Sequence, residues 1–366
     1  MTLPPLLLTL PTETLDEIVS FYKNDIKGLI QISGTSKLCN SLAARYLYAN
    51  APLTRASRLA SFVHLMSRGP QPHRHLQCIQ KLTVNFLPIR APSDAELATL
   101  GGMIAQMINL RELALYRPRI MPTLIPHLRT VHFPGLRSLT TDFCPASAPH
   151  IGPFIALHPA LESLTLKLDI YYSGFNPEAA PPPLVPQPYL PALKDYAGAA
   201  HLIPFFHTRS LRIKHLHWYG PTDDVLAIMA TAAALAPDKR TLSMNTNYVD
   251  AEQLIACTIA VYPDMHDLSI HESDRRIDMK RGLQLAKCLW AAKHLQLLTI
   301  GLPRMGYRGL TQPVSRSPEE HEEDNSIVSL WNDIRSLRGV RFNGIQWFRE
   351  NHDSSRPFVR YVSQIN

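Results

Sequence analysis

A short pattern of apolar and polar positions recurs along most of the chain after residue 78. Each copy has an apolar residue, two variable residues, a central leucine, one variable residue and a second apolar residue, as in "LRELAL" from Leu110 and "LESLTL" from Leu161. Such alternation predicts a β-strand whose central residue is buried. The central residues of ten copies, two of them degenerate and one weak, are Leu82, Leu113, Leu139, Leu164, Leu193, Leu216, Leu242, Leu268, Leu298 and Val340.

The spacing of the copies indicates a repeat architecture. Successive central residues are 23 to 31 positions apart, which is close to the period of a leucine-rich solenoid. Only the last interval, of 42 positions, is longer. Helical segments are predicted between the strands at 93–108, 222–235, 249–262 and 279–295. We therefore expect an α/β fold: a parallel sheet with helices on one face, curved into an irregular leucine-rich-repeat horseshoe. A doubly wound α/β domain is the competing architecture, although no glycine-rich nucleotide motif follows any strand.

The first fifty residues have a different pattern. Apolar residues follow Pro11 at helical spacing, Asp25 can cap a second helix and either Thr35 or Ser36 a third, so three short helices are predicted. Three helices of this size cannot bury so much apolar surface among themselves. We expect the surplus to be covered by another chain or by the rest of this one.

This segment resembles the F-box, in the divergent version that opens many fungal F-box proteins. The resemblance covers about a tenth of the chain and rests on Leu10, Pro11, Glu13, Leu15, Ile18, Leu29, Ser33, Ser36, Leu42, Leu47 and Tyr48. It implies that the three helices dock on the Skp adaptor of a cullin–RING (SCF-type) ubiquitin ligase and that the rest of the chain recruits a protein client. The adaptor-binding residues would then be Leu10, Pro11, Leu15, Ile18, Leu29, Ile30 and Leu42.

These patterns predict the domain organisation. We expect an F-box-like helical domain over 1–52, a linker or first helix over 53–77, a solenoid over 78–350 and a frayed tail over 351–366. Two loop insertions are predicted inside the solenoid, a proline-rich one at 171–191 and one at 303–325 that ends in an acidic cluster.

Composition places the chain among soluble intracellular proteins. Apolar residues make up 45% of it and charged residues 18%, which is a globular balance. The five cysteines are scattered without metal-ligand spacing and indicate buried thiols in a reducing compartment. No apolar run is long enough to span a bilayer, so we expect a cytoplasmic or nuclear protein that binds no membrane.

One charge feature changes the picture of possible partners. The formal net charge is +7, and residues 26–93 contain basic side chains but no aspartate or glutamate. The basic residues are dispersed and no RNA-binding signature accompanies them, so an acidic protein partner fits better than nucleic acid. A merely solvated basic face is the simplest interpretation.

The sequence contains no convincing catalytic constellation, and we expect neither an enzyme nor a cofactor. The most metal-like feature is "HLHW", in which His215 and His217 share one face of a strand. No third ligand stands at a fixed spacing, so we predict exposed strand histidines rather than a metal site.

The predicted client-binding surface is the polar face of the sheet. Residues next to each central leucine point away from the core, and stacked strands align them into one surface. The candidate client-binding residues are Tyr116, Asp142, Lys167, His215, His217, Tyr219, Asn245, Asp267 and His271, with Glu112 and Arg341 beside them.

Two hypotheses of function follow. The first is a substrate receptor of a ubiquitin ligase, with the F-box on the adaptor and the solenoid on a client. The alternative is a protein-interaction scaffold without enzymatic activity, in which the F-box-like helices only cap the repeat domain.

Overall fold

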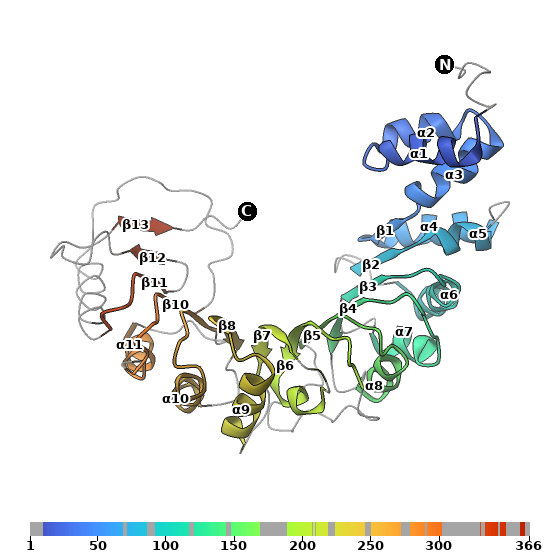
Figure 1. The fold of residues 1–366 in the computed structure, drawn as a ribbon. Helices are drawn as coiled ribbons and strands as arrows, with labels where there is room; N and C mark the ends of the chain where they lie inside the picture. Colours follow the sequence, from blue (N-terminus) through green and yellow to red (C-terminus); the bar gives the residue numbers. More distant parts are fainter. Residues whose placement is uncertain are drawn as a thin grey trace. The chain divides into compact units, whose positions relative to one another are not determined.

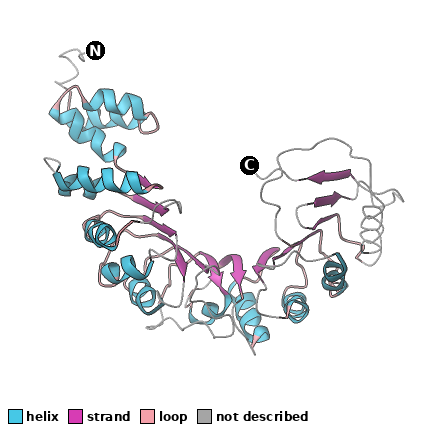
Figure 2. Cartoon of the chain, turned by 180° about the vertical axis from the view of Figure 1, so that it is seen from behind, coloured by secondary structure: helices cyan, strands magenta, loops and turns pink. Residues whose placement is uncertain are grey.

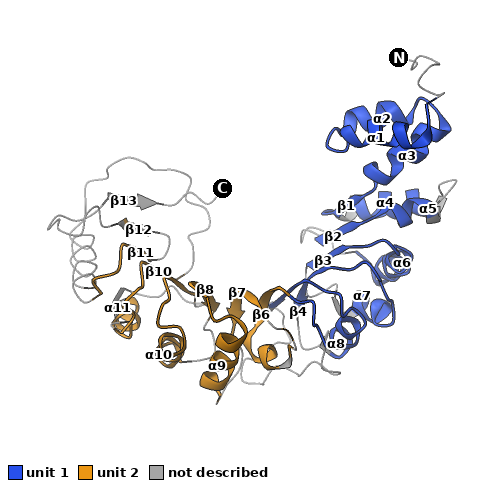
Figure 3. Cartoon of the chain, viewed as in Figure 1, with its two compact units in different colours: residues 1–175, 184–193 blue, residues 176–183, 194–366 orange. Residues whose placement is uncertain are grey.

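The computed structural model covers the whole chain in two compact units, shown in different colours in Figure 3. Unit 1 comprises residues 1–175 and 184–193, and unit 2 comprises residues 176–183 and 194–366. The structure describes residues 10–68, 72–85, 92–116, 121–143, 148–168, 189–206, 208, 210–218, 224–245, 250–271, 279–289, 291–301, 330, 334–342, 345–348 and 359–362. Within these residues no helix is long and apolar enough to cross a membrane.

Unit 1 begins with the three predicted helices, α1 (Thr12–Phe21), α2 (Ile26–Ser33) and α3 (Lys37–Leu47). Two N-caps act as expected: the Asp25 carboxylate accepts from the Gly28 N–H at 3.1 Å, and the Ser36 hydroxyl accepts from the Cys39 N–H at 3.0 Å. The helices enclose a small core of their own, made of Leu15, Val19, Leu29, Leu42 and Ala43.

Five parallel strands follow in unit 1, separated by helices that lie on one side of them (Figures 1 and 2). The strands are β1 (Asn50–Leu53), β2 (Lys81–Asn85), β3 (Glu112–Tyr116), β4 (Ser138–Phe143) and β5 (Ser163–Leu168). The helices are α4 (Ala56–Arg68), α5 (Pro72–Cys78), α6 (Asp94–Ile104), α7 (Met121–Leu128) and α8 (Ala148–Ala156). Four predicted central residues pair in one row and are at most 1% exposed: Leu82, Leu113, Leu139 and Leu164.

The parallel array starts earlier than the sequence pattern indicated. β1 lies directly after α3 and pairs with β2, so the array begins at Asn50 rather than at residue 78. β1 is the outermost strand and contains Pro52, which has no N–H to donate. The segment predicted as a linker or first helix contains α4 and α5, and β1 lies at the end of the segment predicted as the F-box-like domain.

Unit 2 continues the alternation of strand and helix. Its parallel strands are β6 (Asp195–Ala199), β7 (Arg212–His217), β8 (Thr241–Asn245), β9 (Asp267–His271), β10 (Leu297–Ile300) and β11 (Gly339–Phe342). Between them lie a 3-10 helix, η2 (Ala200–Phe205), and the helices α9 (Val225–Leu235), α10 (Ala251–Val261) and α11 (Met279–Lys287). β12 (Ile345–Phe348) and β13 (Val359–Val362) then add in antiparallel order.

The described residues confirm an α/β fold in which parallel strands alternate with helices. All four helices predicted between the strands are present, although α11 ends at Lys287, eight residues before the predicted end. The tail predicted to be frayed contains β13. Most of the 171–191 insertion and all of 303–325 lie outside the described residues.

Two of the ten central residues were assigned to the wrong register. Leu193 and Leu216 are buried as predicted, at 1% and 0% exposed, but they do not occupy the central position. In the regular repeats, the residue two positions before the central leucine accepts a hydrogen bond at its carbonyl from a backbone N–H of the next strand. Arg111, two residues before Leu113, accepts in this way from the Ser138 N–H. In β6 that carbonyl belongs to Lys194, so the central residue is Tyr196.

The error in β7 has a similar origin. Tyr196 pairs with Ile213, and a register shift follows between Tyr196 and Ala197, so that Leu216 pairs with Met244 rather than with Leu242. A β-bulge of this kind inserts one residue and moves the pattern along the strand. Ile213 is therefore the central residue on the β6 side of β7.

Candidate functional site

The residues predicted to bind an adaptor fall into two groups. Leu15, Leu29 and Leu42 are 4%, 1% and 8% exposed and form the core of the three helices, so their nomination as surface contacts is wrong. Three short helices need these side chains to hold them together. Leu10 and Ile18 are half-buried, whereas Pro11 and Ile30 are exposed.

The three helices nevertheless expose apolar side chains. Among the described residues ten large apolar side chains are exposed, and five of these lie within 21–38: Phe21, Tyr22, Ile26, Ile30 and Leu38. We call these five residues the apolar helix surface. Ile26 and Ile30 are 65% and 57% exposed and, four positions apart on α2, lie on the same side of that helix. Of the five, the sequence analysis had assigned only Ile30 to the adaptor.

Polar contacts fix α1 against α3. The Arg45 guanidinium pairs with the Asp16 carboxylate, and the Tyr46 hydroxyl donates to the same carboxylate at 3.4 Å. Because Asp16 lies outside the acid-free stretch 26–93, the pair neutralises one cation of that stretch. Lys81 is neutralised in the same way by Glu112, at 2.6 Å. These two pairs reduce the positive charge of the stretch.

In unit 2 several of the predicted client-binding residues lie together. His217, Asn245 and His271 are direct register partners on β7, β8 and β9, so their side chains share one face of the strands. His215 packs against His217 with ring centroids 4.3 Å apart, and its Nδ1 hydrogen-bonds the Ser243 hydroxyl at 2.7 Å. We call His215, His217, Asn245 and His271 the histidine face.

The environment of the histidine face restrains its rings. The Nδ1–H of His271 donates to the Gly301 carbonyl at 2.9 Å. Burial lowers the pKa of His271, and the positive charge of Arg341 lowers it further, against the opposing effect of the Gly301 hydrogen bond. All four side chains are half-buried, which leaves part of each surface for a partner.

In unit 1 three other predicted client-binding residues lie close together. The Lys167 ammonium lies 5.1 Å from the Tyr116 ring centroid, within cation–π range. Asp142 is the register partner of Lys167 on the neighbouring strand. The remaining candidates are dispersed: Asp267 is half-buried in β9, and Tyr219 lies outside the described residues.

The part of the chain that the structure describes has no cluster of metal ligands and contains four free cysteines. No group of three or more His, Cys, Asp or Glu side chains is placed there to hold a metal ion. The described cysteines Cys39, Cys78, Cys257 and Cys288 are free thiols. Burial raises the pKa of the last three, which disfavours the reactive thiolate.

Comparison with known proteins adds no assignment. No protein-family model matches the chain, and no curated protein matches it.

Proposed function

We propose that this chain is the substrate-recognition subunit of a cullin–RING ubiquitin ligase of the SCF type. The three N-terminal helices would bind the Skp adaptor as an F-box, and the strand–helix repeats would form an irregular leucine-rich-repeat horseshoe that holds a protein client. The observation that carries the proposal is the apolar helix surface. Apolar side chains exposed on a structural unit this small are typical of a protein-interaction site.

On this proposal the chain contributes binding rather than chemistry. Adaptor binding at one end and client binding on the histidine face would bring a client lysine close to a ubiquitin-charged enzyme. Holding two reactants in one assembly raises their effective concentration, which is the main contribution that a receptor makes to the rate.

The test is adaptor binding by the purified full chain. Replacing both Ile26 and Ile30 with glutamine removes exposed apolar area and preserves helix propensity. We expect the Ile26→Gln, Ile30→Gln double variant to bind Skp adaptor at least about tenfold more weakly, since loss of an interface hot spot costs about 2 kcal/mol or more.

Leu226 provides a matched control, because it is 56% exposed on α9 in unit 2. The Leu226→Gln variant should bind adaptor like the wild type. Equal adaptor binding by the double variant, or no adaptor binding by the wild type, would contradict the proposal.

A second function has its own support. α3 leads directly into β1, and at the end of α3 the Tyr48 ring packs on His75 of α5 with centroids 4.7 Å apart. Such continuity suits helices that cap a repeat array in an interaction scaffold. Absence of adaptor binding together with loss of stability when α1–α3 are deleted would favour this scaffold.

A further inference from the structure

Unit 2 contains a cavity of about 740 Å³ at the amino-terminal edge of its strands. Its volume lies within the usual range of small-ligand pockets, which is about 300–1,000 Å³. Three segments line it. They are residues 210–214, which enter and begin β7, residues 235–241 from the end of α9 to the start of β8, and Lys194 before β6. The cavity does not involve the histidine face.

Backbone hydrogen bonds hold these three segments together. The Leu211 N–H donates to the Leu235 carbonyl at 2.8 Å, which joins the segment before β7 to the end of α9. The Arg212 N–H donates to the Lys194 carbonyl at 2.6 Å. Leu211, at 3% exposed, anchors this wall in the core. Backbone hydrogen bonds therefore join the segments that bound the cavity.

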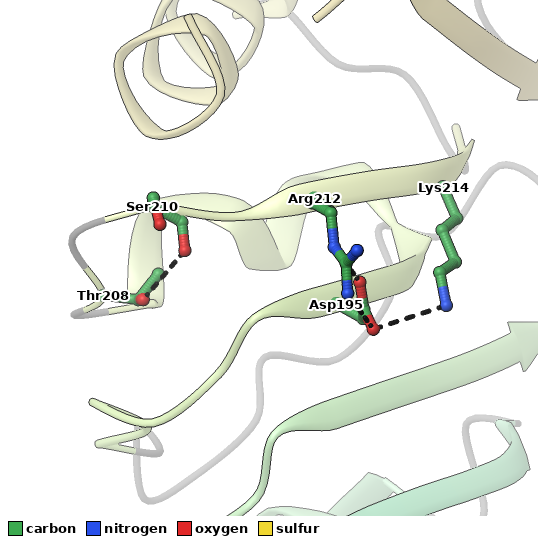
Figure 4. Close-up of polar contacts among 5 residues, drawn as sticks. All are labelled: Asp195, Thr208, Ser210, Arg212 and Lys214. Carbon is green, nitrogen blue, oxygen red and sulfur yellow. Dashed lines mark hydrogen bonds and ion pairs between the residues drawn. The ribbon is translucent and has the colours of Figure 1, made fainter. Parts of the chain in front are cut away.

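The charge of the lining is strongly one-sided. Its five cationic side chains are Lys194, Arg212, Lys214, Lys239 and Arg240, and its single carboxylate is Asp238. A second carboxylate, Asp195, lies beside the cavity and binds two of the five cations (Figure 4). The lining is therefore predominantly cationic.

The Asp195 contacts position the neighbouring cations. Asp195 Oδ2 accepts a hydrogen bond from Arg212 Nη2 at 3.0 Å, and Asp195 Oδ1 lies 2.7 Å from Arg212 Nε as an ion pair. The same carboxylate lies 3.5 Å from the Lys214 ammonium. The Asp195 carboxylate, shared in this way, directs two cations to one side of the strands while neutralising only one charge.

At the cavity margin the Thr208 hydroxyl donates to the Ser210 carbonyl at 3.2 Å (Figure 4).

Lys239 and Arg240 have no such partner, because no carboxylate of the described residues lies within ion-pair distance of either. Burial lowers the pKa of Lys239 to about 8. A half-buried ammonium without a counter-ion destabilises the folded chain, and a bound anion would relieve this cost.

We propose that this cavity binds a multiply charged phosphate group, with Lys239 and Arg240 as its direct ligands and the Asp195-positioned Arg212 and Lys214 beside them. Several cations within one cavity match a group that carries two or more negative charges, and guanidinium groups bind phosphate oxygens in bidentate fashion. The group can come from a free polyphosphate or from a phosphorylated side chain. The inference does not depend on the proposed ligase function.

The cations at the end of α9 also interact favourably with the negative end of that helix. The helix dipole explains why cations occur at positions 239 and 240, after the end of α9. It does not explain the three other cations of the cavity, which come from Lys194 and β7. It also predicts no response to phosphate, so ligand binding separates the two explanations.

The experiment is calorimetric titration of the full chain at pH 7 with pyrophosphate and, separately, with a phosphoserine peptide and its unphosphorylated form. We expect saturable binding of at least one phosphate probe and no binding of the unphosphorylated peptide. Lys239→Met and Arg240→Gln should each weaken binding about tenfold, the usual effect of losing one charge-assisted hydrogen bond.

Lys293 is exposed in unit 2 and does not line the cavity, so Lys293→Met is the matched control and should bind like the wild type. Tighter binding of pyrophosphate would identify a free polyphosphate as the source, and tighter binding of the phosphopeptide would identify a modified protein. Failure of both phosphate probes to bind would overturn the proposal, as would undiminished binding by both cavity variants with unligated melting temperatures like the wild type.

Discussion

At the scale of single residues, one buried polar side chain of the described residues was not singled out by the sequence analysis. His158 is 2% exposed, its Nδ1–H donates to the Phe154 carbonyl at 2.6 Å, and its Nε2 accepts from the Phe133 N–H at 2.9 Å. The ring also stacks on Phe133, with centroids 5.7 Å apart. His158 thereby joins the end of α8 to the segment before β4. No local motif marks it, because its two partners lie on different segments.

His158 should make unit 1 sensitive to mild acid. Burial, reinforced by the neighbouring His132, lowers its pKa to about 4 from 6.5, against the opposing hydrogen bond to Phe154. Between these pH values the unfolded chain binds a proton that the folded chain does not, so folding stability falls as pH decreases. From pH 7 to pH 5 this group should account for a loss of about 2 kcal/mol.

Urea titrations at the two pH values measure this loss. Glutamine at position 158 keeps polar atoms but does not titrate, so His158→Gln should lose about 2 kcal/mol less stability than the wild type over this interval. His64 is exposed on α4, and His64→Gln should retain the full loss. An identical pH dependence in wild type and His158→Gln would show that the buried ring is not the sensor.

At the scale of elements, the repeat pattern predicted the strands well and their registers less well. The central leucines were found because one buried position per repeat must be apolar, and this constraint is visible in the sequence. The assignments at Leu193 and Leu216 failed because Tyr196 and Ile213 fill the central position there, and an aromatic or β-branched residue is equally acceptable to the core. The bulge after Tyr196 depends on pairing between strands, which no single segment encodes.

The row of paired leucines gives a prediction for strand stability. Leu139 is 1% exposed and pairs with Leu113 and Leu164 on either side. Leu139→Ala should reduce the free energy of unfolding by about 2–5 kcal/mol, through lost burial and the cavity left behind. Thr140 is adjacent but on the opposite face, so Thr140→Ala should cost less than about 1 kcal/mol. Equal losses in denaturant melts of the two variants would contradict the assignment of faces.

At the scale of the whole molecule, the sequence located candidate surfaces better than the residues that form them. Three of the seven nominated adaptor contacts are core, because a helical unit this small needs its regularly spaced apolar residues for its own packing. Phe21, Tyr22, Ile26 and Leu38 were not nominated as adaptor contacts, and only the structure shows that they are exposed. The basic cavity of unit 2 was also missed, since its cations come from segments separated in the sequence.

If the histidine face holds a client, substitutions there should abolish client binding without affecting adaptor binding by the apolar helix surface. The double variant His215→Ala, His217→Ala removes two half-buried rings and the bond to Ser243, and leaves α1–α3 unchanged. We expect it to retain adaptor binding and to lose specific proteins that co-purify with the wild-type complex, as quantified by mass spectrometry. Ser269→Ala, on the same face of β9, is the control. Identical sets of co-purified proteins from the double variant and the wild type would refute a client site there.

Pro52 has a consequence for what can attach to the outer strand. The Ala49 carbonyl accepts from the Lys81 N–H, so residues 49, 51 and 53 present their backbone groups to β2, and residues 50 and 52 present theirs to the outer edge. Proline at position 52 removes a donor from that outer edge, where a foreign strand would otherwise extend the ladder. Copies of this chain are thereby discouraged from joining edge to edge into fibres at this end.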